Sequence, residues 1–200
     1  MTRYTPGRLV LLLVGCVVLG LGVGLLLTAD LGSDGYSTLV NGIARSSGVS
    51  FVWCNLAVSA AFVLLAAVRG LFPDVGTVVQ IVVVGFTVSA VLDRLATPDG
   101  LVSRAALLVA AFPVLATGIA AYLGSNLGAG PAEGAAIAWD PPVPFRWSYS
   151  VVQGGGALVG WLLGAAIGPG TVAVVLLLGP AVDLAARVLR VNVTQGRADD

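Results

Sequence analysis

Six long apolar runs follow one another along the chain, separated by short polar stretches. They cover residues 9–28, 51–69, 77–95, 105–123, 147–166 and 171–189. Because about 20 apolar residues in a helix cross the hydrocarbon core of a bilayer, each run predicts a membrane span. The first run is longer than the apolar part of a signal peptide, and no small-residue cleavage motif follows it, so we expect it to stay as a span.

Two further segments, 34–45 and 131–139, have helical patterns but are too short to cross a membrane. A helix of about twelve residues reaches only about 18 Å. Each segment follows a glycine-containing polar break, "ADLGSDG" in the first case and "SNLGAGP" in the second. The pattern predicts two re-entrant helices, two interfacial helices or two halves of broken helices, and the sequence leaves these three alternatives open.

The two halves of the chain repeat each other. The motif "FVW" at 51–53 returns 94 residues later as "FRW", and "GTV" at 76–78 also returns after 94 residues. Upstream, "DLG" at 30–32 matches "NLG" after 96 residues, which a two-residue difference in one loop explains. Matches of glycine and valine are common in so apolar a chain, but two aromatic residues and a Gly-Thr pair at one spacing indicate a duplication.

The duplication predicts an inverted repeat. We expect a single membrane domain over 1–200, with one repeat at about 9–95, a second at about 105–189 and a short cytoplasmic tail at 190–200. Three spans per half insert the second half upside down, so the fold class is an all-α polytopic protein with six spans in two inverted three-helix repeats. Inverted repeats with interrupted short helices are typical of secondary transporters. A duplication that only builds a stable symmetric bundle is the alternative.

Composition narrows the function classes. Hydrophobic residues make up 58% of the chain and charged residues 10%, against about 25% charged in a soluble domain. The formal net charge is zero, so we expect no nucleic-acid partner. There is no histidine, and Cys16 and Cys54 are isolated in apolar runs, so we expect no metal, no cofactor and no enzyme.

The arginines predict the orientation, since cytoplasmic loops carry an excess of positive charge. Seven lie on one predicted side and three on the other: Arg3, Arg8, Arg69, Arg146, Arg187, Arg190 and Arg197 against Arg45, Arg94 and Arg104. We therefore expect a multi-pass protein of a bacterial plasma membrane with both termini in the cytoplasm. The first short helix then lies at the outer side and the second at the inner side.

Several motifs carry a family resemblance. They are "LGSDGYSTLVNGIA", "FPDVGTVVQIVVVGF", "LGAGPAEGAAIA" and "FRWSYSVVQGGGALVGWLLGAAIGPGTVAVVLLLGPAVD", with the spacing between them. Over about residues 10–190 the chain resembles the YczE/YyaS/YitT family of bacterial integral membrane proteins. It is most similar to short YczE-like members, which lack the cytoplasmic domain of YitT-type members. The resemblance implies a duplicated six-helix membrane protein and implies little about its substrate.

The two polar breaks supply the candidate substrate site. Its residues are Asp30, Gly32, Ser33, Asp34, Asn126, Gly128, Gly130, Pro131 and Glu133. Proline suits the first turn of a helix, Ser or Asp suits the N-cap, and the free N–H groups of such a start attract anions. Two opposed half-helix ends at a central site are one interpretation, and two capped loop helices at the membrane surface are the other.

Acidic residues at these breaks have two interpretations. A carboxylate in or near hydrocarbon is costly and marks ion or proton paths, which favours a functional role for Asp30 and Glu133. Glu133, three residues into its helix, would then bind a coupling proton or a cationic substrate. It would equally complement the positive end of its own helix dipole. A structural role as an N-cap is favoured for Asp34.

Other polar positions are assigned structural or gating roles. The pairs Gly76-Thr77 and Gly170-Thr171 open the third span of each half, where a helix start with close packing is favoured over a binding loop. Asp183 and Arg187, one helical turn apart, indicate a helix-end anchor more than a gate. Four polar residues inside spans are expected to form hydrogen bonds between helices: Asn55, Gln80, Tyr149 and Gln153.

Together these observations predict a transporter of an unknown small solute or ion that works by alternating access. The expected partners are the lipid bilayer, the solute or ion, and a second copy of the chain or another membrane protein. The competing prediction is a non-transporting membrane partner or scaffold. A water-accessible midplane cavity lined by Asp30, Asn126 and Glu133 distinguishes the two classes, because only a transporter needs one.

Overall fold

The computed structural model describes residues 4–192, so most of the predicted cytoplasmic tail lies outside the described residues. Within that range the chain forms eight α-helices and no strand. They are α1 (Pro6–Ala29), α2 (Gly35–Ser47), α3 (Phe51–Ala67), α4 (Val75–Leu92), α5 (Leu101–Gly124), α6 (Pro131–Ala138), α7 (Phe145–Leu162) and α8 (Pro169–Leu189). The two short helices predicted from the pattern are present as α2 and α6.

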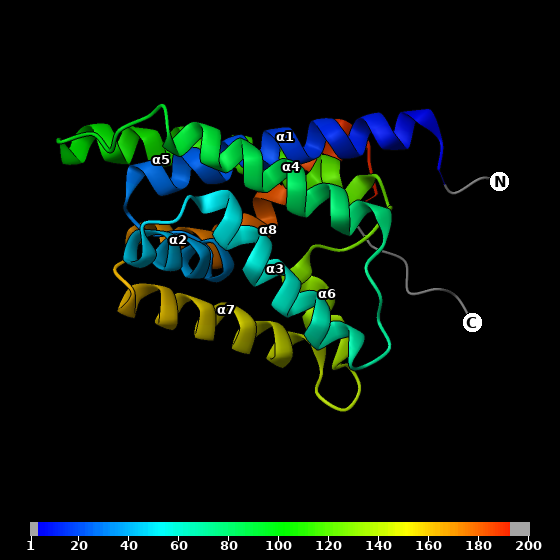
Figure 1. The fold of residues 1–200 in the computed structure, drawn as a ribbon. Helices are drawn as coiled ribbons and strands as arrows, with labels where there is room; N and C mark the ends of the chain where they lie inside the picture. Colours follow the sequence, from blue (N-terminus) through cyan, green and yellow to red (C-terminus); the bar gives the residue numbers. More distant parts are fainter. Residues whose placement is uncertain (1–3, 193–200) are drawn as a thin grey trace.

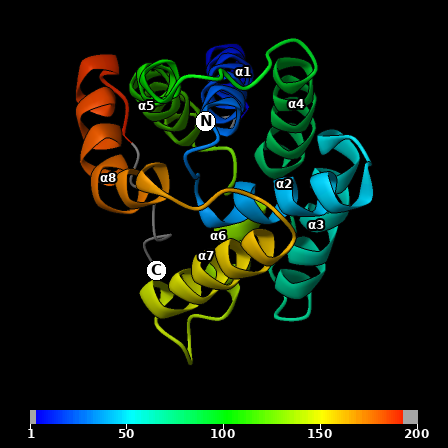
Figure 2. The same ribbon diagram turned by 90° about the vertical axis from the view of Figure 1, so that its left-hand side faces the viewer.

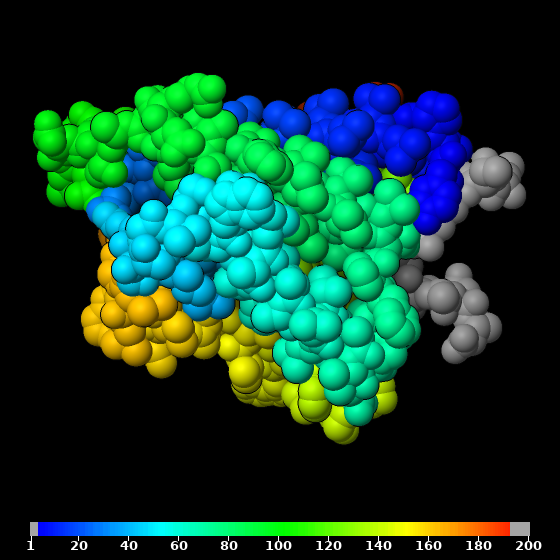
Figure 3. Space-filling model, viewed as in Figure 1, coloured from blue at the N-terminus to red at the C-terminus, as the bar shows by residue number. Residues whose placement is uncertain are grey.

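The helices form two layers (Figures 1 and 2). In one layer α8, α5, α1 and α4 lie side by side, with α1 packed between α5 and α4. In the other layer α2 packs against α7 and α6 packs against α3. Helix α3 also packs against α4 and so joins the layers at one side, and in the space-filling view it lies at the front with parts of α2 and α7 visible beside it (Figure 3).

Four of the helices are long and apolar enough to cross a membrane: α1, α4, α5 and α8. The other two predicted spans, α3 and α7, are helices as well, but they are not both long and apolar enough to count as membrane-crossing helices. Helix α3 has only 17 residues. Helix α7 has 18 residues and carries Arg146, Tyr149 and Gln153 among them. The chain is thus an all-helical protein with four long apolar helices, and the six-span arrangement stays a prediction.

Helices α1 and α5 pack closely and run antiparallel. A Cβ at Gly22 would lie 2.6 Å from the Cα of Leu115, and a Cβ at Gly118 would lie 2.5 Å from the Cα of Leu19. Only glycine permits so close an approach of two helix backbones. Leu12 and Cys16 on α1 are fully buried in the adjoining core. Cys16 and Cys54 are both buried and free, in agreement with their predicted role as packing residues.

The same order of helix lengths occurs twice along the chain. A long helix, a short helix and two further helices form α1 to α4 and again α5 to α8. The short helices start at Gly35 and Pro131, 96 residues apart, and α4 and α8 start at Val75 and Pro169, 94 residues apart. These are the two spacings found in the sequence, so equivalent residues begin equivalent helices.

Candidate functional site

Each polar break is hydrogen-bonded to the start of a helix from the other half of the chain. The backbone N–H of Gly76 donates to the carbonyl of Leu127 at 2.9 Å, and the N–H of Gly170 donates to the carbonyl of Leu31 at 2.8 Å. Leu31 and Leu127 are equivalent in the repeat, as are Gly76 and Gly170. The two Gly-Thr pairs therefore act as helix starts that hold the opposite break, which agrees with the structural role favoured for them.

The breaks share an unusual backbone conformation. Asp30 and Asn126 have φ values of 51° and 57°, and Gly32 and Gly128 have φ values of 101° and 144°. At Gly32 a Cβ would also lie 2.7 Å from the backbone nitrogen of Gly168. Positive φ and close approach together require glycine at this position. The left-handed residue at the end of each long helix explains why α1 and α5 stop there.

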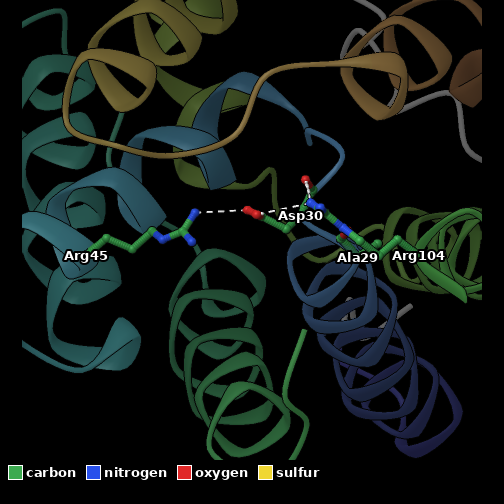
Figure 4. A network of polar contacts seen from close by, with 4 residues as sticks. All are labelled: Ala29, Asp30, Arg45 and Arg104. Carbon is green, nitrogen blue, oxygen red and sulfur yellow. Dashed lines mark hydrogen bonds and ion pairs between the residues drawn. The ribbon is translucent and has the colours of Figure 1, made fainter. Parts of the chain in front are cut away.

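Asp30 lies between two arginines (Figure 4). Its carboxylate is 2.9 Å from Arg45 of α2 and 3.1 Å from Arg104 of α5. The Arg104 guanidinium also donates to the carbonyl of Ala29 at 2.8 Å, at the negative end of the α1 helix dipole. Two guanidinium groups compensate the charge of Asp30, so this carboxylate connects α1, α2 and α5 electrostatically. Its equivalent Asn126 is exposed and has no ion pair.

Asp34 caps helix α2. One carboxylate oxygen accepts from the backbone N–H of Ser37 at 2.9 Å, and the other accepts from the hydroxyl of the buried Ser33 at 3.2 Å. This is the N-cap role favoured from the sequence.

A network of side-chain hydrogen bonds connects α3, α2, α7 and α6. The hydroxyl of Tyr36 donates to Asn55 Oδ1 at 2.9 Å and lies 2.7 Å from the hydroxyl of Ser59. The backbone N–H of Tyr36 donates to Gln153 Oε1 at 3.1 Å, and Gln153 Nε2 donates to the hydroxyl of Tyr149 at 2.7 Å. Asn55, Tyr149 and Gln153 thus form the contacts between helices that the sequence predicts.

Glu133 lies at the α6 end of this network. The Tyr149 hydroxyl donates to Glu133 Oε1 over a long distance of 3.5 Å. The other oxygen of Glu133 lies over the start of its own helix, since a Cβ at Gly130 would be 2.5 Å from it and 3.3 Å from Gln80 Nε2. Burial raises the pKa of Glu133, its own backbone N–H lowers it, and the charge of Asp34 raises it further.

Two depressions occupy equivalent positions in the repeat. The larger has a volume of about 870 Å³ and the smaller about 10 Å³. Equivalent residues line both: Leu71, Phe72, Gly128, Ala129, Gly134 and Ile137 in the large one, and Ala165, Ala166, Gly32, Ser33, Thr38 and Asn41 in the small one. The large depression lies beyond the end of α5 and the small one beyond the end of α1. Because α1 and α5 run antiparallel and end at opposite sides of the ribbon (Figure 1), the two depressions are at opposite ends of the molecule.

Two buried hydroxyl groups near the small depression have no hydrogen-bond partner among the described residues. They are Thr38 Oγ1 and Thr171 Oγ1. Thr38 lines the small depression, and Thr171 is pressed against Gly32. At the other end Thr77, the equivalent of Thr171, donates to the carbonyl of Ala129 at 2.7 Å. Thr171 is therefore tightly packed but lacks the side-chain hydrogen bond that its equivalent Thr77 makes.

The remaining candidate residues are dispersed, and the two depressions do not bring Asp30, Asn126 and Glu133 together as predicted: Asp30 lines the small depression, and Asn126 and Glu133 line neither. Gly130 and Pro131 start α6 and line the large depression beside Gly128. Asp183 and Arg187 are exposed on α8 and form no ion pair with each other in the part of the chain that the structure describes. The sequence did not identify Tyr36 or Arg104 as residues of the candidate site. The signal for Tyr36 was its place two residues after an N-cap, and no local signal marks Arg104, which reaches Asp30 only in the folded chain.

Comparison with known proteins gives the family. Residues 6–187 match a family of unknown function, DUF6198, and the chain belongs to that family. The chain is also similar to a protein from Haemophilus influenzae (strain ATCC 51907 / DSM 11121 / KW20 / Rd), described as an uncharacterized protein. The two are 31% identical over 166 residues, which cover 81% of this chain and 75% of the relative. No solved structure matches the chain significantly.

Proposed function

We propose that the chain is a membrane transporter of a small solute or ion that works by alternating access between two inverted repeats. In this proposal α3 and α7 complete a set of six spans, and α2 and α6 are re-entrant helices that enter from opposite sides. The antiparallel packing of α1 against α5 and the reciprocal hydrogen bonds between the halves support an inverted relation. The repeated helix order supports the same arrangement.

One observation carries the proposal: equivalent residues surround a depression of about 870 Å³ at one end and of about 10 Å³ at the other. An inverted repeat gives both ends the same backbone fold, so each end can adopt the packing that its counterpart has in this structure. A motion that exchanges the two packings closes the large depression and opens the small one. This exchange moves access to a central site from one face of the membrane to the other.

The polar groups at the small depression favour a modest free-energy difference between two states: one with the large depression open and one with the small depression open. A buried hydroxyl without a partner costs about 1–3 kcal/mol. Thr38 and Thr171 both bear this cost while the small depression is closed. When the small depression opens, water enters and forms hydrogen bonds with these two hydroxyl groups. These bonds offset part of the free energy that is lost with the packing contacts. A small energy difference is what a two-state transporter needs.

The proposal also includes a relation to the YczE/YyaS/YitT family and an orientation in the bacterial plasma membrane. The motifs shared with the YczE/YyaS/YitT family support a relation between that family and DUF6198. The distribution of arginines supports cytoplasmic termini in a bacterial plasma membrane, which puts the large depression on the cytoplasmic side. The structure would then represent an inward-open state.

Cysteine labelling from each side of the membrane tests the proposal. Cys16 and Cys54 are replaced by alanine, and single cysteines are placed at the equivalent positions Ser33 and Ala129. A membrane-impermeant maleimide is applied to right-side-out and to inverted vesicles, with an exposed position, Asp99→Cys, as a one-sided control. Alternating access predicts that both positions react from both sides. Labelling of Ser33→Cys only from outside and of Ala129→Cys only from inside would contradict it and favour a non-transporting scaffold.

A further inference from the structure

Helix α8 lies at the edge of its layer, and its one extensive contact with another described helix is with α5 (Figure 2). Its other side carries six large apolar side chains that are between 57% and 74% exposed: Val172, Val175, Leu176, Leu177, Leu184 and Val188. Because α8 is long and apolar enough to cross a membrane, either lipid or another helix covers this side of it.

Two charged residues, Asp183 and Arg187, interrupt this apolar side. Both side chains are exposed, and neither forms an ion pair or a hydrogen bond within the part of the chain that the structure describes. Asp183 lies about 9 Å before the last residue of α8, Leu189. A carboxylate at such a depth is costly in lipid, and its short side chain reaches the membrane surface less easily than that of arginine does. A cover that brings a positive charge to Asp183 is therefore favoured.

The first repeat shows that a helix fits on the equivalent face. On α4, Gly85 is equivalent to Gly179 and Ser89 is equivalent to Asp183. Gly85 lies against α3, since a Cβ there would be 2.7 Å from Asn55 Nδ2, and Ser89 is buried. On α8 the same two positions are exposed, and a Cβ at Gly179 would meet nothing within 4 Å. A face that another helix covers in one half of the chain is thus uncovered in the other half.

We propose that this face of α8, formed by Leu176, Gly179, Asp183 and Arg187, binds the same face of a second copy of the chain. Two copies with the same orientation in a membrane are related by a twofold axis along the membrane normal, so their α8 helices run parallel. Equal residues then lie at equal depth. Helical side chains lean toward the helix N-terminus, so Arg187 reaches back to the depth of the partner's Asp183. This ion pair forms twice, once on each side of the axis.

The residues of the face favour a second copy over lipid alone. Lipid hydrocarbon offers no charge to Asp183, whereas a second copy carries both required charges one helical turn apart. Gly179 lies one turn before Asp183, and a small residue there lets two helix backbones approach closely. No residue of α8 lines either depression. The dimer therefore leaves both depressions unobstructed and does not rest on the proposed transport function.

Cross-linking in liposomes locates the interface. Cys16 and Cys54 are replaced by alanine, and one cysteine is introduced by Leu176→Cys or Gly179→Cys. A short bifunctional maleimide should link two copies through either position. Val109→Cys on α5, where the native side chain is 72% exposed, is the control and should stay monomeric. Equal linking at Val109→Cys, or no linking at the α8 positions, overturns the proposal.

Charge exchange tests the ion pairs, and both positions are exposed, so the fold should tolerate it. Asp183→Arg and Arg187→Asp each place like charges across the axis and should weaken dimer formation about tenfold or more. The double variant exchanges the two charges and should dimerise within about threefold of the wild type. The two single variants should also associate with each other, because one face then carries only positive and the other only negative charge. Single-molecule photobleaching at decreasing protein-to-lipid ratios measures each dimer.

The remaining outcomes distinguish this proposal from others. Single variants that dimerise normally, or a double variant that does not recover dimer formation, overturn it. A link within one chain between Gly155→Cys and Gly179→Cys, in place of links between chains, would show that α7 covers this face and would overturn it as well. A dimer combined with one-sided cysteine labelling supports this interface and overturns alternating access. A monomer with two-sided labelling does the reverse.

Discussion

The two ends of the molecule are built from equivalent residues, yet one holds a depression of about 870 Å³ and the other a depression of about 10 Å³. At the closed end the carboxylate of Asp30 lies between Arg45 and Arg104. At the open end the equivalent residue, Asn126, is exposed and neutral. The backbone conformation of the breaks is alike, whereas the side chains that bridge neighbouring helices differ.

The helices that flank the depressions differ in the opposite sense, since α3 and α4 line the large depression and the α7–α8 loop lines the small one. Asn55 on α3 donates to the carbonyl of Ile81 on α4 at 2.9 Å, beside Gly85, and α3 packs against α4. The equivalents on the other side are Tyr149 on α7 and Gly179 on α8, and a Cβ at Gly179 would meet nothing within 4 Å. Helices α3 and α4 are therefore packed against each other, whereas the equivalent helices α7 and α8 pack against α2 and α5 instead. Closely similar halves adopt two packings in one molecule.

The substitution expected to disturb the closed packing most is Gly35→Ala, which adds one methyl group. A Cβ there would overlap the backbone carbonyl of Gln153, where α2 meets α7. Gly35→Ala should lower the free energy of unfolding by about 2–3 kcal/mol, as measured by denaturant unfolding in detergent micelles. Gly134→Ala on α6 is the matched control, since a Cβ there meets nothing within 4 Å. Equal losses in the two variants would show that α2 and α7 are not packed as described.

Removal of the arginines at Asp30 should open the small depression. Arg104 bonds to the carbonyls of Ala29 and Asp30 and to the Asp30 carboxylate, whereas Arg45 contacts the carboxylate alone. Arg104→Met should cost about 1–2 kcal/mol and Arg45→Met less than about 0.5 kcal/mol, since the latter pair is more exposed. Both variants should increase the labelling of Ser33→Cys. Unchanged labelling would mean that these ion pairs do not hold the closed end.

The equivalent residues Thr77 and Thr171 compare a hydroxyl that forms a hydrogen bond with one that does not. Thr77 donates to the carbonyl of Ala129, so Thr77→Val should destabilise the protein by about 1 kcal/mol. The Thr171 hydroxyl has no partner among residues 4–192, so Thr171→Val should be neutral or slightly stabilising and should favour the closed end. Thermal unfolding of the two variants in parallel measures the difference. A larger loss for Thr171→Val would contradict the contrast between the ends.

The smallest effect concerns pH. Burial raises the pKa of Glu133 above that of the unfolded chain, so the folded protein binds the extra proton more tightly. The stability contributed by Glu133 is fully present below the unfolded pKa of about 4.3 and is lost as pH rises through the folded pKa. The wild-type melting temperature should therefore fall relative to that of Glu133→Gln over this window. A constant difference between the two proteins would contradict a raised pKa.

Much of the helix arrangement could be predicted from the sequence, because apolar runs and glycine breaks are local signals. The short helices at Gly35–Ser47 and Pro131–Ala138 begin close to where the pattern places them. The pairing of Asp30 with Arg104 could not be predicted, since 74 residues separate them and only the packing of α1 on α5 brings them together. For the same reason the sequence suggested Asp30 as a substrate ligand, while the structure shows its charge compensated by arginine.

The most direct test of the central claim measures the two depressions in one population of molecules. Spin labels at Phe72→Cys and Ile137→Cys span the large depression, and labels at the equivalent Ala166→Cys and Asn41→Cys span the small one. Alternating access predicts that electron–electron distance measurements in nanodiscs find the same two distances for both pairs. It also predicts that conditions which lengthen one pair shorten the other. A single fixed distance for each pair under all conditions would contradict the account.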